Sequence, residues 1–147
     1  MTPRPHEFLD LAWRRGAVPP ATRRCVWAMD RPRQLATARR GVRQYLAGCR
    51  CPASTDEVDS VVTVLDELAT NALRHGAPPA SVELCEHPEG WLVVARDADP
   101  GHAPVPAVDR PPELGGMGLH MVVALTRRHG IATGSRSKSV WALVPHG

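Results

Sequence analysis

The chain has 147 residues, of which 43% are hydrophobic and 22% charged, and this is enough to bury one core but too little to suggest two domains. Its formal charge of +3 is small and its arginines are scattered among acidic residues, so the composition argues against a nucleic-acid-binding surface. No apolar stretch is long enough to cross a bilayer, and the N-terminal residues lack the apolar core of a signal peptide, so we expect a cytoplasmic protein.

The first third of the chain predicts a tail, a strand and a helix. Residues 1–24 are rich in Arg and Pro and are assigned to a flexible tail, which leaves residues 25–147 for the domain. The apolar run at residues 25–29 predicts a strand, and Asp30 behind it is typical of a helix N-cap. Apolar residues at helical spacing then predict a helix over residues 32–47, which Gly48 ends.

The second predicted helix has the clearest signals of start and stop. Ser54 followed by Glu57 forms a capping-box pattern, and Gly76 with two prolines behind it ends the helix. Between these ends the apolar residues form one continuous stripe at helical spacing: Val58, Val61, Val62, Leu65, Leu68, Ala69 and Ala72.

The rest of the chain predicts a hairpin, a long loop, a third helix and two short strands. Residues 81–87 and 91–97 are strand-like on either side of a His-Pro-Glu-Gly turn, and residues 98–114 carry five prolines. A helix is expected from residue 119 to about 129, ended by Gly130, before strands at 131–133 and 140–144. These elements predict an α/β fold, a two-layer α+β sandwich whose mixed, mainly antiparallel sheet has three helices on one face.

Glu67 and Asn71 are the first candidates for chemistry. They lie four residues apart on the polar face of the second predicted helix, so their side chains are neighbours. An Asn carbonyl oxygen is a hard ligand suited to Mg²⁺, and a nearby carboxylate can accept a proton from a hydroxyl or a water. Such a pair is more often only a solvated helix surface, and the two residues alone leave both interpretations open.

Two further segments could contact a nucleotide. Asp97 ends a predicted strand, where its carboxylate could accept a hydrogen bond from an exocyclic amine such as that of adenine, or could simply form a turn. Gly115, Gly116 and Gly118 directly precede a predicted helix, and a helix N-terminus favours phosphate. The sequence contains neither a P-loop nor a G-x-G-x-x-G motif.

Taken in order, these segments resemble the conserved boxes of the GHKL ATPase superfamily. The matching segments are DELATNALRHG at residues 66–76, VVARDADPG at 93–101, GGMGLHMV at 115–122 and SKSVWALV at 137–144. The loop at residues 102–114, which is short for the lid of this superfamily, the Gly-Met-Gly-Leu sequence and the absence of a phosphoacceptor or sensor domain are most similar to the anti-sigma-factor branch, whose members are serine-protein kinases. The resemblance covers about residues 25–144.

The resemblance implies roles for the helix and strand candidates. Asn71 matches the Mg²⁺ ligand of the family, Glu67 its general base, Asp97 its adenine-reading carboxylate and Gly101 the hinge beside the base. Asp99 stands where the family usually has glycine, which places an additional negative charge beside the implied nucleotide.

The two later boxes carry the remaining implied positions. The turn and helix start that hold phosphates in the family match Gly116, Met117, Gly118 and Leu119. In the family a small hydroxyl residue lies near the adenine, and either Ser139 or Lys138 stands at that position, since the register is open by one residue. Ser137 stands where the family usually has glycine.

The function that the resemblance implies is an ATP-binding regulator with Mg²⁺ as its second cofactor. It would be an anti-sigma factor with serine/threonine-protein kinase activity, in which an ATP-bound homodimer sequesters a sigma factor and phosphorylates an antagonist protein. An ATP-binding interaction module without kinase activity, a slow ATPase and a detached histidine-kinase catalytic domain remain alternatives. No direct contact with nucleic acid or membrane is expected.

Overall fold

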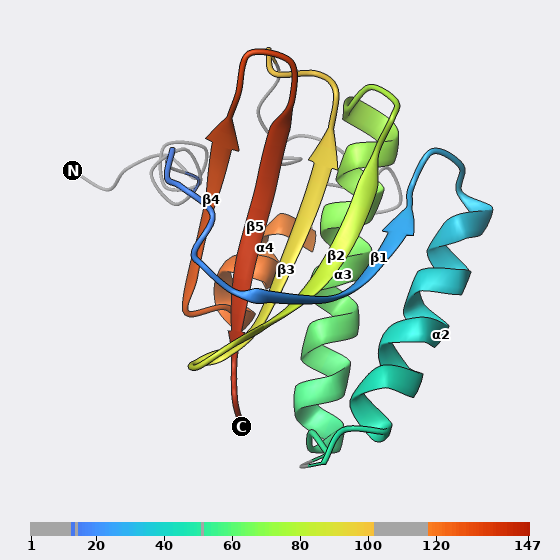
Figure 1. Ribbon diagram of the computed structural model, residues 1–147, viewed down its shortest axis with the longest axis vertical. Helices are drawn as coiled ribbons and strands as arrows, with labels where there is room; N and C mark the ends of the chain where they lie inside the picture. Colours follow the sequence, from blue (N-terminus) through green and yellow to red (C-terminus); the bar gives the residue numbers. More distant parts are fainter. Residues whose placement is uncertain (1–12, 14, 51, 102–117) are drawn as a thin grey trace.

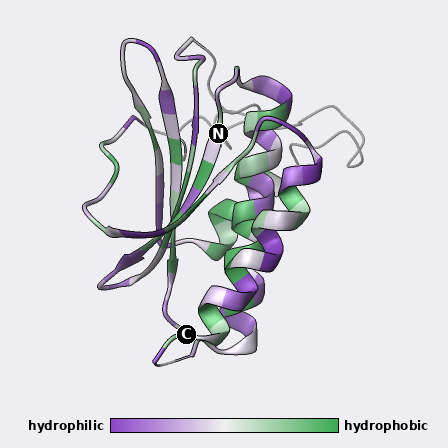
Figure 2. Ribbon diagram, turned by 45° about the vertical axis from the view of Figure 1, so that its right-hand side comes forward, coloured by the Kyte–Doolittle hydropathy of each residue, from purple (hydrophilic) through white to green (hydrophobic). Residues whose placement is uncertain are grey.

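The computed structural model describes residues 13, 15–50, 52–101 and 118–147. In this part of the chain the elements follow the order β1 (Thr22–Ala28), α2 (Arg33–Ala47), α3 (Thr55–His75), β2 (Ser81–His87), β3 (Gly90–Asp97), α4 (Gly118–Leu125), β4 (Arg128–Thr133) and β5 (Lys138–Pro145). The strands form one five-stranded sheet in the order β1-β2-β3-β5-β4, with all four neighbouring pairs antiparallel (Figure 1). Seen from the side, the sheet and the helices form two layers (Figure 2), so the predicted α/β sandwich is confirmed.

Both faces of the sheet are apolar, which explains why its strands read as almost continuous apolar runs. The face toward the helices contributes alternate residues of the two central strands to the main core: Trp91, Val93 and Ala95 of β3, and Val140, Ala142 and Val144 of β5. The residues between them point to the other face and form a second, smaller cluster: Leu92, Val94, Trp141 and Leu143, with Cys85 of β2.

The segment before β1 crosses this second face of the sheet (Figure 1). The backbone N–H of Gly16 donates to the carbonyl of Ile131 at 2.9 Å, and the indole N–H of Trp141 donates to the carbonyl of Gly16 at 3.1 Å. Val18 packs against the smaller apolar cluster, and Trp13 is buried in the main core. Described residues that the sequence assigns to a tail therefore contact the sheet, and β1 itself begins at Thr22 rather than at residue 25.

Helix α3 is the central support of the helix layer. Its predicted cap is confirmed, because the Ser54 hydroxyl accepts the backbone N–H of Glu57 at 3.2 Å. The apolar stripe faces the sheet, with Val61, Leu65 and Leu68 almost completely buried. Helix α2 packs against one side of α3 and α4 against the other. None of the helices in the described ranges is long and apolar enough to cross a bilayer.

Two predicted details are wrong. Asp30 does not cap α2, since its carboxylate accepts the backbone N–H of Ala80 at 2.7 Å, and α2 begins after Pro32 without a side-chain cap. The third helix ends at Leu125 instead of continuing to about residue 129. The chain leaves the helix because the Arg127 N–H bonds to the carbonyl of Leu143, and the following residues pair with β5 as β4.

Candidate functional site

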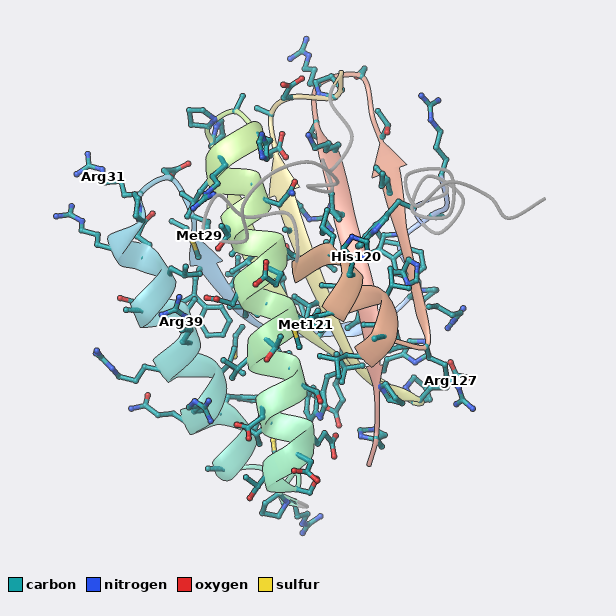
Figure 3. The ribbon with its side chains drawn as sticks, turned by 180° about the vertical axis from the view of Figure 1, so that it is seen from behind. Met29, Arg31, Arg39, His120, Met121 and Arg127 are labelled. Carbon is teal, nitrogen blue, oxygen red and sulfur yellow. The ribbon has the colours of Figure 1, made fainter. Side chains whose placement is uncertain are left out.

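The C-terminal half of α3 carries the first two candidate residues. Asn71 is buried at 9% exposure, and Glu67, one turn earlier, is half-buried. Within the described residues, no hydrogen bond involves the carboxamide of Asn71. The described part of the chain therefore leaves this carboxamide available to a ligand. Helix α4 lies beside α3 in front of the sheet (Figure 3).

The environment of Glu67 favours its protonated form more than water does. Burial raises the pKa of Glu67 above its ordinary value, the neighbouring Asp66 carboxylate raises it further, and Arg74 opposes both. A carboxylate whose pKa is raised toward neutrality is a better proton acceptor than an ordinary surface glutamate. The surroundings of Glu67 are therefore suited to general-base chemistry.

Gly76 brings the end of α3 against Asp97. A Cβ atom at Gly76 would lie 2.6 Å from Cγ and 2.8 Å from Oδ2 of Asp97, and 2.6 Å from the carbonyl oxygen of Ala72. Only glycine fits these contacts without a shift of the backbone or of the carboxylate. A second link lies next to it, because the backbone N–H of Ala98 donates to the carbonyl of Ala77 at 2.8 Å. The last turn of α3 and the end of β3 are thus held together.

Asp97 is buried at 3% exposure and has two partners of its own. Its Oδ1 accepts the backbone N–H of Asp99 at 2.8 Å, so the turn-forming interpretation of this residue is confirmed. Its Oδ2 lies 3.5 Å from Nζ of Lys138, which is also 3% exposed, in an ion pair directly across β3 and β5.

Gly101 continues this turn. Its backbone N–H donates to Oδ1 of Asp99 at 3.0 Å, so Asp97 and Asp99 each accept an N–H two residues ahead. The carboxylate of Asp99, which replaces a usual glycine of the family, is therefore used within the turn. Residues 102–117, which follow Gly101, lie outside the described residues.

Ser139 is not brought to Asp97. Neighbouring residues of a strand point to opposite faces of a sheet, and Ser139 lies on the face away from the helices. There its hydroxyl accepts Nη1 of Arg96 at 2.9 Å, and Arg96 forms an ion pair with Glu83. Of the two residues that the sequence left open, Lys138 is the one beside Asp97, and Ser139 lies on the opposite face of the sheet.

The glycine segment before α4 lies partly outside the described residues, since Gly116 and Met117 belong to the undescribed part. Gly118 is the first residue of α4, and Leu119 follows at 1% exposure within the main core. The side chain of Leu119 therefore anchors the helix start, and the backbone N–H groups of this first turn are left for an anion.

The remaining contacts show what sequence reasoning missed. The sequence marks Gly76 only as a helix stop, although its close contact with Asp97 links two of the site segments. The ion pair between Asp97 and Lys138 could be foreseen only once the register of β5 against β3 was known. No motif in the sequence signals either contact.

The donor set can be compared with what Mg²⁺ requires. Asn71 offers one carboxamide oxygen without a partner among the described residues, and Glu67 offers a carboxylate one turn away. Across the described ranges, no cluster of three His, Cys, Asp or Glu side chains could hold a metal. This set fits Mg²⁺ that keeps waters and phosphate oxygens as most of its ligands, because Mg²⁺ rarely uses an all-protein cage.

One comparison with known proteins matches most of the chain. A search of curated proteins gives no match. The family model described as the histidine kinase-like ATPase domain matches residues 28–143, which span the elements from the end of β1 into β5. The match includes α3 with Glu67 and Asn71, the end of β3 with Asp97, and the start of α4. The chain belongs to the histidine kinase-like ATPase domain family.

Proposed function

We propose that this domain binds ATP with Mg²⁺ between α3 and α4 and transfers the terminal phosphoryl group to a serine or threonine of a partner protein. The contact of Gly76 with Asp97 is the observation that carries the proposal. It joins the helix that bears Glu67 and Asn71 to the carboxylate suited to a nucleobase amine.

Each described residue has a role that fits its surroundings. The Asn71 carboxamide oxygen would be the protein ligand of the metal, and the first N–H groups of α4 would face the phosphates. Glu67, whose pKa is raised by burial, would accept the proton of the attacking hydroxyl. Bound Mg·ATP would supply the phosphoryl group, and the charge of Mg²⁺ would offset the negative charge of the phosphate oxygens during transfer.

The biological partners are a further part of the proposal and rest on the resemblance to the anti-sigma-factor branch. We propose that the domain acts as a homodimer that sequesters a sigma factor, and that its phosphoryl acceptor is an anti-sigma antagonist.

Phosphoryl transfer with labelled ATP tests the proposal. The purified protein is incubated with Mg²⁺, ATP labelled at the γ-phosphate and candidate antagonist proteins, and ATP binding is measured in parallel by calorimetry. Label on a serine or threonine of the partner supports the kinase. Binding without transfer supports an interaction module, and release of free phosphate alone supports an ATPase.

Two variants and one control make this test specific. Glu67→Gln should bind ATP almost as the wild type does but lose transfer, and Asn71→Ala should lose the Mg²⁺ dependence of binding. Asp59→Asn is the control, because Asp59 is a carboxylate on the same helix whose side chain is 57% exposed and pairs with Arg43. If no adenosine nucleotide produces heat or a thermal shift with the folded wild-type protein, the proposed function is refuted.

A further inference from the structure

We propose that Lys138 competes with the nucleobase for the carboxylate of Asp97, so that this chain binds adenine nucleotides more weakly than the rest of its site would allow. The inference rests on the proposed function, since it concerns the residue that would read the base. It names Lys138 as a residue that sets both affinity and base preference.

The two charged side chains form a buried ion pair. Asp97 and Lys138 are direct partners in the register of β3 and β5, and both point to the helix side of the sheet. Their side chains are 2% and 3% exposed, and Nζ of Lys138 lies 3.5 Å from Oδ2 of Asp97. The pair thus lies at the end of the sheet where α3 also ends, with almost no contact with solvent.

Both oxygens of Asp97 are already in use. Oδ1 accepts the N–H of Asp99, while Oδ2 faces Lys138 and lies where a Cβ atom added to Gly76 would be 2.8 Å away. An amino group of a base that approaches Oδ2 would have to displace the ammonium group or share the oxygen with it. The structure therefore presents Asp97 as a carboxylate that an internal cation already occupies.

The exchange is unfavourable for a neutral amine. The ammonium group of Lys138 attracts the Asp97 carboxylate through a full positive charge, whereas an exocyclic amine of adenine carries no charge and offers only a hydrogen-bond donor. Displacement would also leave the buried ammonium of Lys138 without this partner, which costs further free energy. Both costs lower the affinity for a base whose amino group has to bind Asp97.

A hydroxyl residue at this position would remove the competition. Threonine is shorter than lysine and uncharged, so in Lys138→Thr the Oδ2 atom would be free to accept an amine. The gain should depend on the base. Inosine triphosphate carries a carbonyl oxygen where adenine carries its amino group, and a carbonyl cannot donate to Asp97.

Calorimetric titrations of Mg·ATP and Mg·ITP into the wild type and three variants test the inference. Lys138→Thr should bind ATP at least tenfold more tightly than the wild type, with a clearly smaller gain for ITP. Lys138→Met keeps the apolar stem without the charge and should also gain affinity for ATP, so the test survives if one variant does not fold. Lys138→Arg keeps a cation beside Asp97 and should show no gain.

Thermal melting establishes that each titrated variant is folded. If the wild type binds ATP, and folded Lys138→Thr and Lys138→Met bind it no more tightly, the inference is overturned while the proposed function stands. An equal gain for ATP and ITP also overturns it, because the effect would not come from the amino group. If neither the wild type nor any variant binds ATP or ITP, the proposed function is refuted together with the inference.

Discussion

Replacing Gly76 by alanine tests the contact that joins α3 to Asp97. Gly76 has φ −94° and ψ −177°, which alanine can adopt, so the substitution introduces no backbone strain of its own. The new methyl group would nevertheless lie 2.6 Å from Cγ of Asp97 and 2.6 Å from the carbonyl oxygen of Ala72. Either the carboxylate or the end of the helix has to move.

The size of the effect follows from the crowding. An additional methyl group forced into a packed region costs about 1–3 kcal/mol. For a domain of about this length, each kcal/mol lowers the melting temperature by about 2–4 °C. If the carboxylate of Asp97 is displaced, ATP binding should also weaken at least about tenfold, which corresponds to about 1.4 kcal/mol.

Gly48 provides a matched control. It also ends a helix, with φ −88°, but a Cβ atom there would lie 3.4 Å from the carbonyl oxygen of Gln44, an ordinary contact. Gly48→Ala should therefore change the free energy of unfolding by no more than about 0.5 kcal/mol and leave ATP binding unchanged. Urea unfolding and calorimetry of both variants compare them directly. Equal stability and equal affinity of the two variants would refute the close contact at Gly76.

Metal and proton dependence give three more expectations. Asn71→Ala should abolish the strengthening of ATP binding by Mg²⁺, and an unchanged calorimetric Mg²⁺ dependence would contradict the assignment of this ligand. Because burial and then Asp66 raise the pKa of Glu67, transfer should fall as the pH drops through a value above that of an ordinary glutamate. Asp66→Asn should move that fall to lower pH in a pH–rate profile, and an unmoved profile would exclude Glu67 as the base. Burial acts to raise the pKa of Glu57, but the hydrogen bonds from His146 and a backbone N–H outweigh it and lower that pKa overall. The Glu57 carboxylate therefore adds stability above the ordinary glutamate pKa, and this is lost as the pH falls through the lowered value. Urea unfolding of Glu57→Gln should show a flatter acid limb than the wild type, and identical limbs would rule out the contribution.

The parts of the fold that local chemistry determines could be predicted from the sequence. Helix α3 begins where Ser54 and Glu57 form a capping pattern, and the hairpin of β2 and β3 follows from two apolar runs around a short turn. The end of α4 could not be predicted, because residues after Leu125 carry no local stop signal. The helix ends there through a long-range contact of Arg127 with β5, and pairing then continues as β4.

The candidate site was predictable to the same extent. The four-residue spacing makes Glu67 and Asn71 neighbours on one helix and Asp97 ends an apolar strand, but their roles at a nucleotide rest on the resemblance. The choice between Lys138 and Ser139 could not be made from the sequence, since a shift of one residue moves a strand side chain to the other face of the sheet. Only the pairing of β3 with β5 decides it.

The double role of Asp97 has a consequence for every experiment on this site. As a turn former and the partner of a buried lysine, Asp97 stabilises the fold, and removing one member of a buried ion pair costs about 3–5 kcal/mol. A loss of ATP binding in an Asp97 variant could therefore reflect a damaged fold as well as a missing contact to the base. Substitution of Lys138 separates the two effects, because it also breaks the ion pair but leaves the carboxylate in place. Lower stability combined with tighter ATP binding in such a variant would show that the ion pair stabilises the fold and that the Asp97 carboxylate binds the base.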